Sequence, residues 1–209
     1  MGEPIGQIWG YKVVGITEEG RWLFDDPSNP GQTFTSEDEN ISIETHGQVL
    51  GNSLPLRYAG WNNQFTWKNF DLNISMRGAF DYQIINQYRL RNENVSNKRS
   101  NNKPLSAFDP VMGVSVSKNP IEKIISYYVE DGDYWKVDNI TLGYTLRTPK
   151  QRWIQTIRTY GTIDNAIIIT NYSGNDPESA ARSGLCPGID YQCQYPTTRS
   201  FTLGLNVIF

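Results

Sequence analysis

The last stretch of the chain, residues 198–209, alternates between large apolar side chains and small or polar ones. The apolar positions Phe201, Leu203, Leu205, Val207 and Phe209 share one parity, and Ser200, Thr202, Gly204 and Asn206 share the other. Because successive side chains of a strand point to opposite faces, this pattern predicts a strand with one apolar face and one largely polar face. A strand of a soluble β-sandwich alternates in the same way. The apolar stripe continues to the final residue, however, and the opposite face suits a water-filled lumen, so the pattern favours a transmembrane β-barrel.

Five earlier segments also carry strand-like patterns. Their ranges are 5–16, 57–67, 70–80, 134–146 and 154–168. The clearest pair is the hairpin formed by 57–67 and 70–80, because a turn of only two residues, Lys68-Asn69, fixes its register. On the second arm of this hairpin, the apolar residues Phe70, Leu72, Ile74 and Met76 alternate with Asp71, Asn73, Ser75 and Arg77.

The connections between these six segments alternate in length. Long connections cover 17–56, 81–133 and 169–197, and short ones cover 68–69 and 147–153. Outer-membrane barrels have this asymmetry, with short periplasmic turns and longer extracellular loops, and long loops are uncommon in compact soluble domains. The chain is therefore predicted to be all-β, with six antiparallel strands in the wall of a transmembrane β-barrel and long extracellular loops.

Composition narrows the functional classes. The 209 residues contain 19 Lys plus Arg and 22 Asp plus Glu, so the net charge of −3 gives no electrostatic basis for binding nucleic acid. No apolar run is long enough for a membrane-spanning helix. Aromatic residues make up 12% of the chain, a feature of interfacial girdles and of sugar-binding surfaces. The start, Met1-Gly-Glu-Pro, lacks the basic and apolar regions of a signal peptide, so we expect a piece of a longer exported protein.

Candidates for catalysis and metal binding are few. The single histidine, His46, lies in a polar segment and is interpreted as a surface residue. Asp131 and Asp133 have the chemistry of a glycosidase pair, but a loop cap is the simpler interpretation. The acidic segments 25–31 and 36–40 offer oxygen ligands for calcium without the spacing of an EF-hand loop, which favours solvated loops. No catalytic residue, cofactor site or metal site is predicted, and the chain is not expected to be an enzyme.

The last long connection contains the only two cysteines, Cys186 and Cys193. In an oxidising, exported compartment they are expected to form a disulfide, which would contribute about 2–3 kcal/mol by closing a short loop. Upstream of them, Asn171-Tyr-Ser-Gly-Asn-Asp-Pro-Glu178 is rich in residues that form tight turns. This segment is interpreted mainly as a loop anchor, with contact to a substrate or a lid as the alternative.

Several motifs, taken in order along the chain, resemble the SusC/RagA family of TonB-dependent outer-membrane transporters of Bacteroidota. They are Gly6-Gln-Ile-Trp-Gly-Tyr11, Trp67-Lys-Asn-Phe-Asp-Leu72, Tyr128-Val-Glu-Asp-Gly-Asp-Tyr134, Val137-Asp-Asn-Ile-Thr-Leu-Gly-Tyr144, Thr170-Asn-Tyr-Ser-Gly-Asn-Asp-Pro-Glu178 and the closing segment 195–209. The resemblance implies that the chain is the C-terminal part of a barrel of about 22 strands that surrounds an N-terminal plug. Six strands alone would leave open edges, and open edges cannot face lipid.

The resemblance also implies a function, which is the import of nutrients such as glycans or peptides across the outer membrane by the intact transporter. The implied partners are a SusD-like surface lipoprotein that covers the barrel, the remaining barrel and plug, TonB acting through parts outside these residues, the barrel-assembly machinery and outer-membrane lipid. The terminal strand, whose apolar positions end in Phe209, looks like the signal that the barrel-assembly machinery reads. The alternative is a soluble, secreted, β-rich carbohydrate-binding module that uses the same aromatic residues on a concave sheet.

Overall fold

A computed structural model describes residues 4–38, 41–93, 102–114, 123–148, 153–178, 187–191, 195 and 197–209. The chain divides into two compact units, each with its own sheets. Unit 1 comprises Met1–Leu54, Tyr82–Gly132 and Tyr172–Tyr195, and unit 2 comprises Pro55–Asp81, Asp133–Asn171 and Pro196–Phe209. Unit 2 is therefore built from the long strands, and unit 1 contains most of the three long connections.

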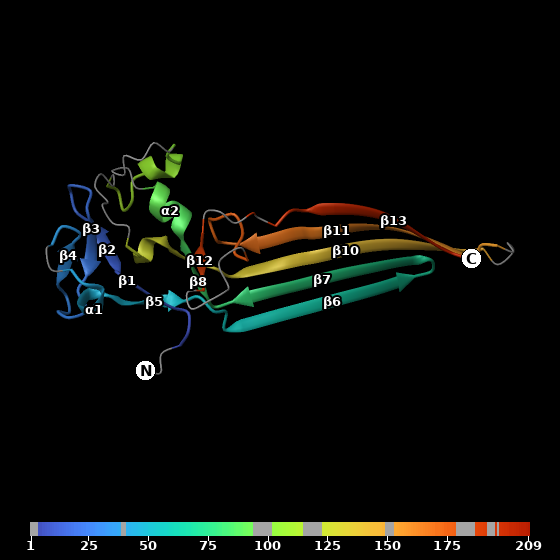
Figure 1. Ribbon diagram of the computed structural model, residues 1–209, viewed down its shortest axis with the longest axis horizontal. Coiled ribbons are helices and arrows are strands. Elements are labelled where there is room, and N and C mark those ends of the chain that lie inside the picture. Colours follow the sequence, from blue (N-terminus) through green and yellow to red (C-terminus); the bar gives the residue numbers. More distant parts are fainter. Residues whose placement is uncertain are drawn as a thin grey trace. The chain divides into compact units, whose positions relative to one another are not determined.

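Unit 2 is one antiparallel sheet of five long strands that lie side by side (Figure 1). In chain order they are β6 (Arg57–Trp67), β7 (Phe70–Phe80), β10 (Tyr134–Arg147), β11 (Thr156–Thr170) and β13 (Ser200–Ile208). The order across the sheet is β13-β11-β10-β7-β6, with every neighbouring pair antiparallel. Each strand thus pairs with the unit 2 strand before it, which is the up-and-down order of a barrel wall. The predicted all-β, antiparallel fold class is confirmed, and the barrel is not closed within this chain.

The apolar face of this sheet is exposed. Its exposed large side chains include Trp61, Phe65, Phe70, Leu142, Tyr144, Phe201, Leu203 and Leu205. Leu203 is 90% exposed and Leu205 is 66% exposed, whereas the two inner faces of a soluble sandwich would bury such side chains in a core. A continuous exposed apolar face is what a lipid-facing strand surface requires.

A β-bulge interrupts β10 at Asp138. The register of β10 with both neighbouring strands shifts between Val137 and Asn139. Because the bulge adds one residue, Val137 and Ile140 lie on the same face although their positions differ in parity. The bulged Asp138 accepts a hydrogen bond from Arg77 Nε at 2.6 Å, so the extra residue also brings a carboxylate to a neighbouring cation.

Unit 1 contains three small sheets and short helices. The sheets are β1 (Gln7–Gly10) with β5 (Gln48–Asn52); β2 (Val13–Ile16), β3 (Trp22–Asp25) and β4 (Thr33–Thr35); and β12 (Ile189–Asp190), β8 (Gln83–Asn86) and β9 (Val129–Asp131). The helices are α1 (Ile43–His46), α2 (Gln87–Asn92) and the 3-10 turns η1 (Leu105–Phe108) and η2 (Ser126–Tyr128). The core of unit 1 consists of Tyr11, Trp22, Phe24, Leu90, Ile125 and Tyr128. Across the described ranges, no helix has the length and apolar character needed to cross a membrane.

The segment 5–16 differs from the prediction of one long barrel strand. It forms β1 and β2, which are separate short strands in two different sheets of unit 1. Ile8 and Tyr11 are both buried, at 4% and 3% exposure, although they have opposite parity and a strand with one lipid face would leave one of them outside. The Tyr11 backbone amide also donates to the Ile124 carbonyl at 3.0 Å, which fixes the chain between the two short strands. In addition, β12 pairs with β8 in parallel, so not every strand pair of the chain is antiparallel.

Candidate functional site

The polar face of unit 2 carries a row in which side chains alternate with glycines. From β7 to β13 the row runs Asp71, Gly143, Tyr160 and Gly204, each opposite the next. A Cβ atom on Gly143 would lie 2.5 Å from the Asp71 carboxylate, and one on Gly204 would overlap the Tyr160 ring. The two glycines therefore leave the space in which the neighbouring side chains lie across the sheet.

Arg158 of β11 completes this row. Its Nη2 and Nε atoms donate to the two carboxylate oxygens of Asp71 at 2.5 and 3.2 Å, so the ion pair passes across β10 at Gly143. The guanidinium also lies 5.2 Å from the centre of the Tyr160 ring. Three further polar pairs on the sheet are Asn62 with Ser75, Thr141 with Thr162, and Asn139 with Asp164. Bidentate ion pairs and hydrogen-bonded side chains suit a surface that meets water rather than hydrocarbon.

The predicted barrel-assembly signal lies on β13 and at the chain end that follows it. Phe201, Leu203, Leu205 and Phe209 are exposed, and Val207 is half-buried. The structure thus presents a nearly continuous apolar stripe next to the C-terminus. The role of these five residues in barrel assembly stays a prediction.

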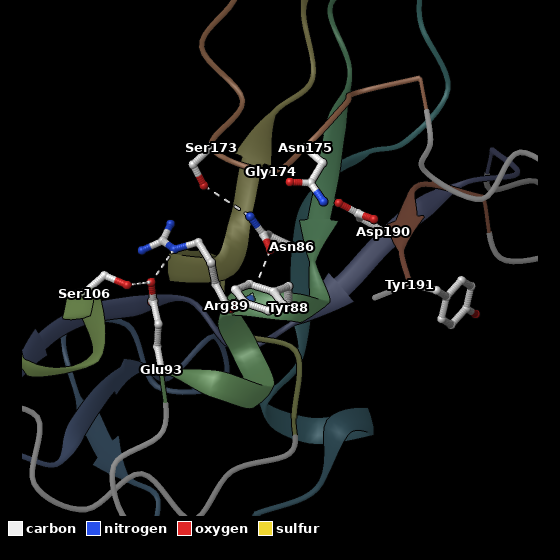
Figure 2. A pocket seen from close by; sticks show the side chains of 10 residues that line it. All are labelled: Asn86, Tyr88, Arg89, Glu93, Ser106, Ser173, Gly174, Asn175, Asp190 and Tyr191. Atoms are coloured by element: carbon white, nitrogen blue, oxygen red, sulfur yellow. Dashed lines mark hydrogen bonds and ion pairs between the residues drawn. The ribbon is translucent and has the colours of Figure 1, made fainter. Parts of the chain in front are cut away.

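Unit 1 contains a polar cavity of about 680 Å³ (Figure 2). Its lining comes from the end of β8 and from α2, from Ser106, from the segment 173–175, and from Asp190 with Tyr191. These segments are far apart in sequence, and hydrogen bonds join them. Asn86 Nδ2, for example, donates to Glu130 Oε1 at 3.1 Å and to Ser173 Oγ at 3.2 Å, which lies 87 residues away.

Arg89 is the central cation of this cavity. Its Nε donates to Glu93 at 2.8 Å and its Nη1 donates to Glu130 at 2.7 Å, while its guanidinium lies 5.1 Å from the centre of the Tyr127 ring. Burial lowers the pKa of Arg89, but the hydrogen bonds and charges of the two carboxylates outweigh burial and raise it above its usual value. Arg89 is therefore a permanent cation that two carboxylates hold in place. Ser106 Oγ donates to the same Glu93 oxygen at 2.8 Å.

Glu130 connects this cluster to the segment after β11. Its two oxygens accept hydrogen bonds from the Ser173 backbone amide and hydroxyl, both at 2.8 Å. Burial raises the pKa of Glu130, but the hydrogen bonds from Arg89 and Ser173 outweigh burial, so the pKa lies below its usual value. Glu130 is thus ionised at neutral pH and fixes both neighbours.

Asp190 forms the other side of the cavity. The buried Tyr172 donates its hydroxyl proton to Asp190 Oδ2 at 2.6 Å. Burial raises the pKa of Tyr172, and the hydrogen bond to Asp190 raises it further. Tyr172 therefore stays protonated and positions the Asp190 carboxylate at the cavity.

The segment 171–178 acts as the predicted loop anchor through Tyr172, Ser173 and Asp176, whose carboxylate accepts the Glu178 backbone amide at 2.8 Å. Ser173, Gly174 and Asn175 also line the cavity. The sequence did not indicate the partners of this segment, which are Asn86, Glu130 and Asp190. It also did not indicate Arg89, which binds Glu130, or Glu93, which binds Arg89. The only local signal was Asn86, whose side chain accepts the Arg89 backbone amide and so caps α2.

The other candidates from the sequence that lie in the described residues include His46, Asp133 and Asp26, each of which contacts a neighbouring residue. The His46 ring packs edge-on against Phe34, with ring centres 4.9 Å apart. Asp133 accepts the Asp81 backbone amide at 2.6 Å, as a loop cap does. Asp26 Oδ2 accepts a hydrogen bond from Asn29 Nδ2 at 2.8 Å, and this bond lowers the pKa of Asp26.

Among the described residues, no group of three or more His, Cys, Asp or Glu is placed to hold a metal ion. Cys186 and Cys193 lie outside the described residues, so the disulfide stays a prediction.

Comparison with known proteins gives relatives in sequence and in fold. The chain is 31% identical to "TonB-dependent receptor P3" of Formosa agariphila over all of this chain and 22% of that protein. It is 28% identical to "TonB-dependent receptor SusC" of Bacteroides thetaiotaomicron over 90% of this chain and 17% of that protein. The solved structure of the RagAB peptide transporter matches with a TM-score of 0.81 at 19% identity, over 96% of this chain and 22% of that chain. No family profile matches.

This chain is a SusC/RagA-like portion of a TonB-dependent transporter. It spans about a fifth of the length of these relatives. The family resemblance seen in the sequence motifs is thereby confirmed. The relatives are named as receptors and transporters, which supports the prediction that the SusC/RagA-like chain is not an enzyme.

Proposed function

We propose that this SusC/RagA-like chain forms part of the wall of an outer-membrane barrel through which nutrients, either glycans or peptides, enter the cell with the help of a SusD-like surface lipoprotein. One observation carries the proposal. Unit 2 is an antiparallel sheet with one exposed apolar face and one face of hydrogen-bonded and ion-paired polar residues. A wall that separates lipid from a water-filled lumen needs this division.

The two edge strands of the sheet set a further requirement. β6 and β13 each pair with a strand on one side only among the described residues. Because unpaired backbone groups are costly in hydrocarbon, other strands must continue the sheet on both sides. We assign those strands, the plug and the TonB contact to parts of the transporter outside this chain.

A soluble carbohydrate-binding module explains the structure less well. Such a module needs a core beneath its sheet, yet Leu142, Leu203 and Leu205 are exposed together on one face. An exposed apolar sheet face with open edges would promote aggregation in water. The transporter wall accounts for both features.

The test uses the natural protein that carries this chain, in its own bacterium. Outer and inner membranes are separated, and the protein is purified from the outer membrane in mild detergent. We expect the protein in the outer-membrane fraction, a SusD-like lipoprotein that co-purifies with it, and loss of growth on one glycan or peptide source when the gene is deleted. Recovery of the protein in the periplasmic or secreted fraction, or unchanged growth of the deletion strain on every such source, would refute the proposal.

A further inference from the structure

A groove of about 540 Å³ lies on the sheet of unit 2 over Gly161 of β11. In the register of the sheet, Gly161 lies between Leu142 of β10 and Leu203 of β13, which both line the groove. The adjacent row on the same face, toward the short turns, also lines it and consists of Phe70, Tyr144, Thr159 and Leu205. Both rows belong to the apolar face, so the groove opens on the side that the proposed function turns toward lipid.

Neither the backbone nor a neighbouring side chain explains the glycine at position 161. Gly161 is not among the residues with a positive φ, so other residues could adopt its backbone conformation. Within the described residues, a Cβ atom on Gly161 would have one neighbour nearer than 4 Å, the Leu203 side chain at 3.4 Å. On Gly143, by contrast, a Cβ atom would collide with the carboxylate of Asp71. The missing side chain at Gly161 therefore leaves open space on the surface, and this space has the size of a ligand site.

An aromatic row borders the groove at the end of the sheet where the short turns lie. Trp67, Phe70 and Tyr144 are register partners across β6, β7 and β10, and successive ring centres are 6.4 and 4.8 Å apart. Trp and Tyr rings place an apolar body against acyl chains and a polar tip at the headgroups of a bilayer. The row that contains Gly161 lies two residues further into the sheet, about 7 Å along the strands. The groove therefore lies at the depth where acyl chains begin below the headgroups.

The charge beside the aromatic row is positive. Lys68 Nζ lies 4.9 Å from the centre of the Trp67 ring. In the described ranges 66–72, 142–148, 155–162 and 202–209, the one acidic side chain is that of Asp71, which pairs with Arg158 on the polar face. These ranges thus leave no carboxylate side chain for Lys68, and the phosphate of a lipid headgroup would complement its charge.

We propose that this groove is a binding site for a glycerophospholipid, with one acyl chain over Gly161 and the phosphate beside Lys68 and Trp67. The inference rests on the proposed function, because that function places the apolar face in lipid and the short turns on the periplasmic side. Hydrocarbon surrounds the site, so the hydrophobic effect does not select the lipid. Packing of the acyl chain in the groove and the contact with the phosphate do so instead.

A second copy of the chain fits the groove less well. The apolar face of that copy would bring the same aromatic row and the same lysine, so it would supply no anion to Lys68. A phospholipid supplies both the apolar chain and the phosphate, in the order in which the groove and Lys68 lie along the strands.

The test maps the lipid contacts of the intact transporter by photolabelling. The purified transporter is reconstituted into phosphatidylethanolamine vesicles that contain one of three probes: phosphatidylglycerol, phosphatidylethanolamine or a lipid A analogue, each with a diazirine near the ester end of one acyl chain. Mass spectrometry after illumination locates the label. We expect the two phospholipids to label Leu142, Tyr144 and Leu203 more strongly than Trp61 and Phe65, which lie on the same face outside the groove.

Two variants with matched controls test the acyl-chain contact and the phosphate contact separately. Gly161→Leu fills the groove and should lower the labelling there about threefold or more, whereas Ala59→Leu enlarges an exposed residue of the apolar face outside the groove and should not. Lys68→Gln should lower labelling by phosphatidylglycerol about fivefold. Arg147→Gln removes a positive charge at the same end of the sheet but from the polar face, and should leave labelling unchanged. Thermal unfolding midpoints check that each variant is folded, and Lys68→Gln decides if Gly161→Leu does not fold.

The possible outcomes separate the groove from the proposed function. Labelling that either folded site variant leaves unchanged, or that is even along the whole apolar face, overturns the groove and leaves the proposed function intact. Stronger labelling by the lipid A analogue, or cross-links between two copies at Leu203 without lipid label in the groove, would assign another occupant and overturn it too. Absence of label from the entire apolar face would show that unit 2 does not face lipid, and the proposed function would then fail as well.

Discussion

Arg89 shows how a single residue can hold several distant segments together. Two carboxylates and the Tyr127 ring surround its guanidinium, and one of those carboxylates, Glu130, also holds Ser173. When one partner of a buried ion pair is removed, the charges left behind lose their compensation, at a cost of about 3–5 kcal/mol. Because Glu93 and Glu130 are both mostly buried, Arg89 is such a partner.

Arg89→Ala is therefore expected to destabilise unit 1 by about 3–5 kcal/mol. Hydrogen exchange in the intact transporter, followed at the segments 126–131 and 172–178, should show loss of protection in this variant. Arg91→Ala, an exposed arginine in the same helix, is the control and should keep wild-type protection. Equal exchange in the Arg89 and Arg91 variants would contradict the role of the cluster.

The lowered pKa of Glu130 predicts a dependence on pH. A carboxyl group whose pKa is lower in the folded state contributes stability above its unfolded pKa of about 4.3, and this contribution disappears as the pH falls through the folded value. The stability difference between wild type and Glu130→Gln should therefore be full at neutral pH and should shrink at acidic pH. Exchange protection at Ser173, corrected for the intrinsic effect of pH, measures this difference. A difference that is constant from neutral to acidic pH would refute the assignment.

At the scale of elements, the polar row of unit 2 depends on glycines at two strand positions. A Cβ atom on Gly143 would lie 2.5 Å from an Asp71 oxygen and 2.6 Å from an Arg158 nitrogen. Gly60 in β6 lies opposite Arg77 and therefore on the same face, but a Cβ there would meet nothing nearer than 4.0 Å. Gly143 and Gly60 therefore lie on the same face of the same sheet, but only Gly143 has side chains close to its Cα.

Gly143→Ala should displace the ion pair between Asp71 and Arg158 and destabilise the sheet by about 1–3 kcal/mol, as overpacking typically does. The thermal unfolding midpoint of the intact transporter should fall in this variant. Gly60→Ala is the control and should unfold near the wild-type midpoint. A Gly143 variant that is as stable as the Gly60 variant would show that the ion pair does not need the glycine.

Some elements of the fold could be predicted from the sequence, and others could not. The strands of unit 2 could be predicted because apolar and polar residues alternate along a strand that has one apolar and one polar face. Phe70–Phe80 shows this alternation. The sequence also contains a signal for the bulge at Asp138, because the apolar residues occupy odd positions up to Val137 and even positions from Ile140. The cavity of unit 1 could not be predicted, because Asn86, Glu130 and Ser173 meet across 43 and 87 residues of sequence. The segment 5–16 was misread because its β-rich composition is shared by barrel strands and by short buried strands.

At the scale of the whole molecule, the proposed function makes this chain part of a barrel wall that other strands must complete, because β6 and β13 are edge strands among the described residues. Its last strand ends beside the C-terminus with an exposed apolar stripe. If the assembly machinery reads this stripe, Phe209→Ala should lower the amount of transporter in the outer membrane, which quantitative blotting of membrane fractions measures. Phe65→Ala, which removes an exposed aromatic from β6, is the control and should assemble normally. Normal levels of the Phe209 variant would refute the assembly role.

The central claim is that unit 2 has lipid on one face and water on the other. The direct measurement places single spin labels along β13 of the intact transporter in lipid, after replacement of Cys186 and Cys193 by serine, and compares their collisions with oxygen and with a water-soluble nickel complex. Labels at Leu203 and Leu205 should collide mainly with oxygen dissolved in lipid, and labels at Thr202 and Asn206 mainly with the nickel complex. Uniform accessibility along the strand, or labels at Leu203 and Leu205 shielded from both reagents, would contradict the account.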